Sequence, residues 1–314
     1  MDKSIKNLLL KSIVGISVGL ICFTYEATSK SRPLLAVSDR QYNNFTQDNL
    51  QYFPDLQDEQ KYRSIINRAN QNNLNNSSMG NIIQTVAHQF LGAEYKAGLL
   101  DKSPQETLVI SLRQFDCLLF IETVLAIANN ISRAEFSYQD FSNEIENKRY
   151  WNGKMNGYCT RLHYFSDWIE DNQRRGNVQN ITRQLGGIDT AKKLNFMTTH
   201  RNSYTNLDKS DANFKCIAGV EASLSETFNY IPTKNIEKIY PQLQPGDIIG
   251  VATNIEGLDF THTGFVYRQP NGKIGLIHAS PAGEVAIAKD LQNYIAKVDN
   301  AIGIVVTRAN KPQS

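Results

Sequence analysis

One cysteine and two histidines give this chain the side chains that a nucleophilic hydrolase needs. Cys117 stands directly before an apolar run in RQFDCLLFIETVLAIA, while His262 opens HTGFVY and His278 lies in IGLIHA. A thiol in the first turn of a helix faces unpaired backbone N–H groups and the positive end of the helix dipole, so its pKa is predicted to be lowered. If the two histidine segments are neighbouring strands, one imidazole could take the thiol proton while the other orients it. This is the nucleophile, base and orienter arrangement of acyl-transfer catalysis.

The segment LGAEYKAG adds Tyr95 as a fourth candidate. It follows Gly92, which ends a predicted helix, so its hydroxyl could donate a hydrogen bond to a developing oxyanion beside the backbone N–H of Cys117. Each signal is weak by itself. A cysteine that opens an apolar helix is more often a small buried hydrophobe, and a histidine at a strand end is usually a satisfied polar residue. A lone cysteine with histidines far along the sequence supports catalysis and a structural role about equally.

The candidate nucleophile is predicted to lie at the start of a helix. Apolar residues recur at three- and four-residue steps from Leu118 to Ala128, and Asp116 is a suitable cap, so the helix should begin at Cys117. From residue 136 to 240 the sequence mixes helical pieces, such as RLHYFSDWIEDNQ, with loops.

A second helix is predicted for MGNIIQTVAHQFLG, capped by Ser77 or Ser78 and ended by Gly92. His88 within it is interpreted as a surface or structural histidine. The apolar residues that share one face of this helix are Ile82, Ile83, Val86, Phe90 and Leu91.

The region after Tyr240 is predicted to form strands. It contains the short β-branched runs IIGVA, HTGFVY, IGLIHA, VAIA and AIGIVVTR. Asn271-Gly272 between two of them indicates a hairpin with a tight primed turn, in which both central residues need positive φ. Helices followed by an antiparallel sheet indicate an α+β fold.

Composition indicates a soluble globular domain that follows an export signal. The 314 residues are 41% hydrophobic, and a formal net charge of +2 without a basic stripe argues against a nucleic-acid partner.

Residues 1–27 combine lysines with a short apolar run, as a signal peptide or an N-terminal anchor does, so the protein is expected to be exported to the periplasm or cell envelope. Residues 28–78 are rich in Asn and Gln and are predicted to be a polar spacer with weak helices, KYRSIINRA among them. Residues 79–310 are the predicted catalytic domain.

The other cysteines do not suggest a disulfide framework. Cys22 is expected to leave with the signal peptide. Cys159 and Cys216 could pair in an oxidising compartment, but two separate buried thiols is the favoured interpretation.

Several motifs resemble those of the NlpC-type cysteine peptidases and amidases, papain-like cell-wall enzymes of bacteria. They are FDC at a helix start, a later TH-x-G strand, a strand ending in histidine, and a G-x-x-Y-x-x-G segment formed by Gly92, Tyr95 and Gly98. Longer segments resemble the N-acetylmuramoyl-L-alanine amidase-like family in particular, and they span roughly Gly80 to Arg308 in that family's order. These segments are FDCLLFIETVLAIA, YWNGKMNGYCTRLHYFSDWIEDN, NFMTTHRNSY, GDIIGVATNIEGLDFTHTGFVYR and the closing HAS.

The resemblance implies a papain-like fold, with helices and the nucleophile packed on a C-terminal antiparallel sheet. It also implies hydrolysis of the amide between the lactyl group and L-alanine in peptidoglycan fragments (muropeptides), without a metal or other cofactor. Cys117 would be the nucleophile, His262 the general base and acid, His278 the orienting residue and Tyr95 part of the oxyanion site. The chain departs from the wider superfamily at Leu118-Leu119, where small residues are usual and where Leu118 could narrow the cleft. It also departs at Thr263, where valine is common.

Arg161, His163, Tyr164 and Asn254 are weaker candidates for substrate binding. Arg161, Tyr164 and Phe165 are expected to share part of one helix, and packing and solvation are the favoured explanation for this segment. Other functions remain open. The same machinery could cut the γ-D-glutamyl–diaminopimelate bond of the stem peptide, or the domain could be a non-catalytic muropeptide-binding module or an envelope scaffold.

Overall fold

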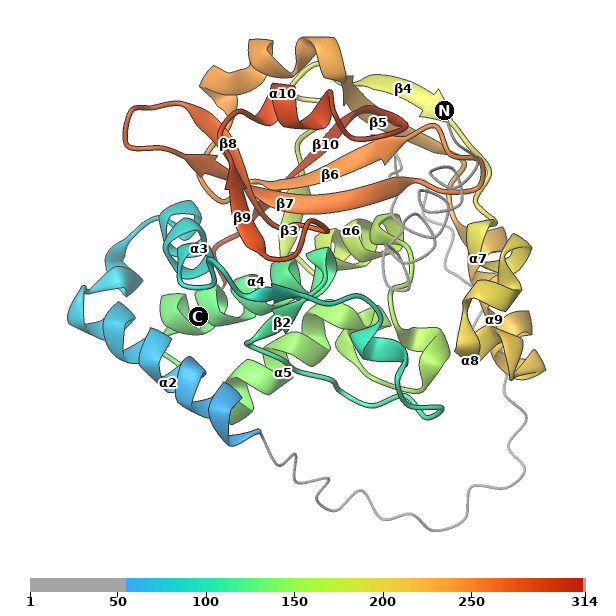
Figure 1. Cartoon of the computed structure of the whole chain (residues 1–314), viewed down its shortest axis with the longest axis horizontal. Coiled ribbons are helices and arrows are strands. Elements are labelled where there is room, and N and C mark those ends of the chain that lie inside the picture. The colour runs from blue at the N-terminus through green and yellow to red at the C-terminus, as the bar shows by residue number, and fades with distance from the viewer. Residues whose placement is uncertain (1–54, 313–314) are drawn as a thin grey trace.

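The structure is a computed structural model that describes residues 55–312, in which a layer of helices packs against one strongly curved sheet (Figure 1). The predicted signal peptide or anchor, Cys22 and the first part of the predicted spacer lie outside the described residues. The α-helices are α2 (Leu56–Gln71), α3 (Met79–His88), α4 (Cys117–Arg133), α5 (Tyr138–Arg149), α6 (Phe165–Arg174), α7 (Phe196–Thr199), α8 (Thr205–Asp208), α9 (Asp211–Ser223) and α10 (Leu291–Ile295). Short 3₁₀ segments include η4 (Tyr158–Thr160) and η6 (Thr233–Gln242).

The large sheet is antiparallel at each of its strand pairs, with order β4-β5-β10-β6-β7-β8-β9 and β3 also paired with β10. Helices before an antiparallel sheet confirm the α+β prediction. The strands are β3 (Val178–Asn180), β4 (Ile188–Ala191), β5 (Thr227–Pro232), β6 (Ile248–Thr253), β7 (Phe260–Arg268), β8 (Ile274–Ala279), β9 (Val285–Ala288) and β10 (Ala301–Ala309). A separate parallel pair joins β1 (Glu94–Tyr95) to β2 (Gln114–Phe115).

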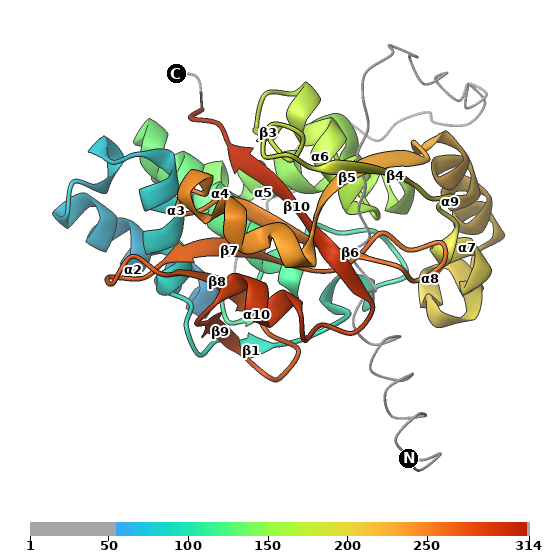
Figure 2. The same ribbon diagram turned by 90° about the horizontal axis from the view of Figure 1, so that it is seen from above.

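Helix α4 is the centre of the helical layer. Its residues from Cys117 to Ile131 are all buried, because the segment is apolar nearly all round and packs against α3, α5 and the strands β7 and β8. The predicted cap is confirmed, since the Asp116 side chain accepts a hydrogen bond from Leu119 N at 2.8 Å. On the other face of the sheet lie η6 and α10, and α10 lies across β8 when the molecule is seen from above (Figure 2).

The hairpin between β7 and β8 is confirmed, but its turn differs from the predicted one. Gly272 has a positive φ of 81° whereas Asn271 does not, so the turn is not the primed type. Gly272 N donates to Gln269 O at 2.8 Å, and Pro270 occupies the second position. The fixed φ of proline suits that position of an ordinary turn, and the glycine then supplies the left-handed residue that returns the chain to the sheet.

The predicted spacer needs correction where the structure describes it. Its expected weak helix is part of the 16-residue helix α2, which buries Tyr62, Ile65 and Ile66 in the main core. Tyr62 also stacks on Phe141 of α5, with ring centroids 4.8 Å apart. The polar composition of this segment obscured an amphipathic helix. Because the apolar face of α2 is buried in the main core, the packed domain includes this segment.

Other expectations also need correction. Cys159 and Cys216 are not two separate thiols: a disulfide joins η4 to α9, with their Cα atoms 6.1 Å apart. Leu91, assigned to the buried face of α3, is 39% exposed, because α3 ends at His88 before the chain turns. Strands β3, β4 and β5 were not predicted, since they are short and partly exposed and lack a clear alternation. Within residues 55–312, no helix has the length and apolar character to cross a membrane.

Candidate active site

Cys117 is the first residue of α4 and lies beside strand β7. The hydroxyl of Thr263 donates a hydrogen bond to the Cys117 carbonyl at 3.1 Å, which fixes the start of the helix against the strand. Thr263 follows His262 directly in β7. Thr263 therefore joins the backbone of Cys117, the predicted nucleophile, to the strand that carries His262. Leu118 is buried in the main core.

The Cys117 thiol is not poised as a thiolate, contrary to the prediction. The residue is 1% exposed, and burial together with the nearby Asp116 carboxyl raises the pKa of the thiol to about 12. Hydrogen bonds from Thr263 oppose this shift without cancelling it. Removal of water from the sulfur outweighs the favourable field of the helix end, so the thiol carries its proton at neutral pH.

His262 and His278 lie on adjacent strands and form a direct pair. Nε2 of His262 is 2.7 Å from Nδ1 of His278, and both rings are buried. Burial and the neighbouring imidazole lower the pKa of His262 well below its usual value, and burial lowers the pKa of His278 to about 4. Both rings are therefore neutral at neutral pH. Nδ1 of His262 is buried and has no hydrogen-bond partner within the described chain, which leaves it free to accept a proton.

Tyr95 ends the short strand β1, which pairs in parallel with β2 just before Cys117. Its backbone N–H donates to Gly283 O at 2.7 Å, so the loop is held against the end of the sheet. The hydroxyl is buried without a partner among the described residues, and burial raises its pKa above the usual value, as do the nearby Cys117 and Asp116. An unpaired buried donor beside the thiol is the feature expected of a group that awaits an oxyanion.

Sequence reasoning missed Tyr294, on the five-residue helix α10. Its ring centroid is 4.6 Å from that of His278 and 6.1 Å from that of His262. Burial and the nearby Cys117 raise the pKa of Tyr294, so the phenol is close to both the thiol and the imidazoles. We call Cys117, His262, His278, Tyr95 and Tyr294 the reactive cluster. No local motif in the sequence marks Tyr294, because its place depends on packing between α10 and β8.

Two of the weaker candidates, Arg161 and His163, bond to residues that do not belong to the reactive cluster. The Arg161 guanidinium is buried against Asp101, with Nη2 and Oδ1 2.6 Å apart, and close to Glu106. Nε2 of His163 lies 2.7 Å from the carbonyl of Tyr158. These groups are committed to partners inside the protein, which fits the structural explanation.

Tyr164 differs from the expectation for it, whereas Asn254 lies on a loop before the strand of His262. Tyr164 is buried and donates its hydroxyl hydrogen bond to Glu221. Residues 161–164 precede α6, which begins at Phe165, so the expected shared helix is wrong for them. Asn254 is exposed in the loop between β6 and β7, and its backbone N–H donates to Asn300 O at 3.0 Å. His88 is exposed and stacks on Tyr267, as expected of a surface histidine.

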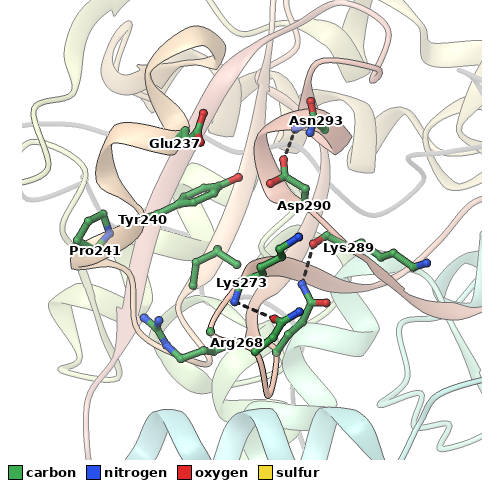
Figure 3. A pocket seen from close by; sticks show the side chains of 12 residues that line it. Glu237, Tyr240, Pro241, Arg268, Lys273, Lys289, Asp290 and Asn293 are labelled. Atoms are coloured by element: carbon green, nitrogen blue, oxygen red, sulfur yellow. Dashed lines mark hydrogen bonds between the residues drawn. The ribbon is translucent and has the colours of Figure 1, made fainter.

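An open cavity of about 890 Å³ lies between η6, the β7–β8 hairpin and the start of α10, and no residue of the reactive cluster lines it (Figure 3). Its lining contains neither cysteine nor histidine. Glu237 and Tyr240 face Asp290 and Asn293 of α10 across it. Within residues 55–312, no group of three or more His, Cys, Asp or Glu side chains could hold a metal ion.

Comparisons with known proteins point to one family. Residues 85–304 match the family described as N-acetylmuramoyl-L-alanine amidase-like. A solved N-acetylmuramoyl-L-alanine amidase from Bacteroides uniformis is 30% identical, with a TM-score of 0.71 over 75% of this chain and 100% of its own. A putative xylanase from Bacteroides fragilis is 33% identical, with a TM-score of 0.67 over 71% of this chain and 99% of its own. A protein from Legionella pneumophila shares the fold at 23% identity, with a TM-score of 0.60 over 80% of this chain and 95% of its own. A comparison with curated proteins found no match.

Proposed function

The chain belongs to the N-acetylmuramoyl-L-alanine amidase-like family, and from this we propose that it is a cell-wall hydrolase that cleaves the amide between the lactyl group of N-acetylmuramic acid and L-alanine. Its substrates are peptidoglycan fragments in the cell envelope. The observation that carries the proposal is the His262–His278 pair at 2.7 Å, in which Nδ1 of His262 has no partner among residues 55–312. The strand of His262 is also hydrogen-bonded to the start of the helix that Cys117 opens.

The proposed catalytic group is a neutral thiol that reacts together with a neutral base. Nδ1 of His262 takes the thiol proton as the sulfur attacks the carbonyl carbon of the amide. The pKa shifts favour this route, because a protonated thiol and neutral imidazoles form no thiolate–imidazolium pair before substrate arrives. The charge on His262 is then stabilised by its Nε2–H bond to His278.

The tetrahedral oxyanion receives hydrogen bonds from the Tyr95 hydroxyl and the backbone N–H of Cys117. His262 returns its proton to the departing amine nitrogen, which breaks the C–N bond and leaves a thioester on Cys117. Water, deprotonated by His262, hydrolyses the thioester and restores the thiol. We assign the fold to the papain-like NlpC type on the same ground, a cysteine at a helix start packed on antiparallel strands that carry its histidines.

Incubation with defined disaccharide-peptides, followed by mass spectrometry of the products, tests the function. The wild-type protein should release the intact stem peptide from the sugar, and Cys117→Ala and His262→Ala should not. His88→Ala is the matched control, because this exposed histidine lies outside the cluster and should retain full turnover. Products that are cut within the stem peptide would show that the protein is an endopeptidase and not an amidase. Binding of muropeptides with no turnover by the wild type would leave only a recognition module.

A further inference from the structure

The hydroxyl of Tyr294 lies near Nδ1 of His278, the atom whose protonation distinguishes the two possible proton arrangements of the histidine pair. Its hydroxyl oxygen is 3.5 Å from Nδ1 of His278, the nitrogen that also faces Nε2 of His262 at 2.7 Å. The phenol approaches from α10, on the opposite face of the sheet from α4 (Figure 1). Its ring packs against His278 at 4.6 Å.

A single proton lies between the two neutral imidazoles, and it has two arrangements. In one, His262 carries its proton on Nε2 and donates to His278, so Nδ1 of His262 is bare and can act as a base. In the other, His278 donates from Nδ1, and His262 must carry its own proton on Nδ1. The second tautomer cannot accept the thiol proton of Cys117.

We propose that Tyr294 is a positioning residue that selects the competent tautomer, by directing its hydroxyl proton at Nδ1 of His278 and so keeping that nitrogen an acceptor. The inference rests on the proposed role of His262 as the base. Tyr294 acts through the two histidines and has no direct part in bond breaking. Nδ1 of His278 has a single lone pair, and Nε2–H of His262 uses it at 2.7 Å, so Tyr294 is the weaker of two donors at that nitrogen and its contact of 3.5 Å is long.

The surroundings of Tyr294 suit a hydrogen-bond donor. Burial raises its pKa above the usual value, and the nearby Cys117 raises it further, so the phenol keeps its proton at neutral pH. A hydroxyl proton directed at Nδ1 opposes the tautomer that carries a proton on that nitrogen, because the two hydrogens would then face each other.

Helix α10 is held firmly enough to present the phenol without rearrangement. Asp290 caps the helix by accepting from Asn293 N at 2.8 Å, and Gln292 N donates to the Tyr240 hydroxyl at 2.8 Å. Leu291 and Ile295 are fully buried in the second core beneath the helix. Asp290 and Asn293 also line the cavity that Figure 3 shows. A side chain fixed in advance loses little entropy when its contact forms.

Histidine tautomers can be read by NMR of protein labelled with ¹⁵N-histidine, without any turnover. In the wild type, His262 should show the Nε2–H form with a bare Nδ1. In Tyr294→Phe, which keeps the ring and its packing, the His262 signals should shift toward a mixture of both tautomers. The turnover number kcat should fall roughly five- to tenfold with KM unchanged, as loss of one modest hydrogen bond allows.

Tyr267→Phe serves as the control, because Tyr267 stacks on the exposed His88 and lies outside the cluster. It should change neither the His262 signals nor kcat. An unchanged His262 tautomer in Tyr294→Phe would overturn the inference, whatever happens to the rate. A shifted tautomer with wild-type kcat would overturn it too. Absence of hydrolysis by the wild type is a separate outcome, which removes the proposed function while the NMR result still decides whether Tyr294 sets the tautomer.

Discussion

The thiol of Cys117 experiences two opposing influences, and burial is the larger. A helix N-terminus is worth up to about 2 kcal/mol in a partly buried site. The pKa of the thiol nonetheless rises from 9.0 to about 12, and each pKa unit corresponds to about 1.36 kcal/mol. In the proposed mechanism, catalysis by Cys117 therefore depends on a neutral base with a free nitrogen, the role that we propose for His262.

The pH dependence of hydrolysis should reflect the lowered pKa values of the histidines. The proposed mechanism needs a neutral imidazole; burial keeps His278 neutral until the pH falls to about 4, and burial and the neighbouring ring hold the pKa of His262 well below its usual value. We expect kcat/KM to stay level as the pH decreases from neutral and to fall only as it approaches 4. Initial rates with a defined muropeptide measure this, with circular dichroism at each pH to confirm folding. An acid limb centred near 6.5, the pKa of an ordinary imidazole, would contradict the buried pair.

At the scale of elements, one hydroxyl joins the start of α4 to β7 by a hydrogen bond. Thr263→Val removes the hydrogen bond to the Cys117 carbonyl, and we expect the free energy of unfolding to fall by about 1 kcal/mol. Thr261→Val on the same strand is the matched control, because the Thr261 hydroxyl is buried without a partner in the described chain. Loss of the Thr261 hydroxyl should leave the free energy of unfolding unchanged or slightly higher. Urea unfolding of both variants measures the difference, and equal losses would show that the Thr263 bond contributes nothing.

Local patterns predicted the elements that carry the site, and packing decided the rest. The cap at Asp116, the helix from Cys117 and the strands of His262 and His278 were predictable, because capping chemistry and β-branched runs are local signals. The depth of Cys117 was not, since burial is set by the sheet laid over α4. Tyr294 lies on a helix too short to show a periodic pattern, so only the folded chain reveals it.

At the scale of the molecule, the reactive cluster gathers residues from five elements. Tyr95 comes from β1 and Cys117 from α4, while the histidines come from β7 and β8 and Tyr294 from α10. Figure 2 shows α10 and β8 at one side of the sheet, with α7 to α9 gathered at the far end from α2. The site therefore forms only when the helical layer packs against the sheet.

The Cys159–Cys216 disulfide should stabilise the whole domain, because it closes a loop of 57 residues between η4 and α9. The chain-entropy relation gives about 4 kcal/mol for a loop of this length. We expect the Cys159→Ser, Cys216→Ser double variant to lose stability on this scale in chemical denaturation. The wild type treated with reductant should behave likewise. Identical unfolding curves for all three samples would mean that the crosslink does not constrain the unfolded chain.

The most direct test of the central claim is to trap the acyl-enzyme. Wild-type protein mixed with a defined disaccharide-peptide and quenched in acid should carry the sugar's lactyl acyl group as a thioester. Peptide mapping by mass spectrometry should place that group on Cys117, and Cys117→Ala should neither form it nor release stem peptide. Hydrolysis that continues in Cys117→Ala, with no adduct on the wild type, would contradict the account.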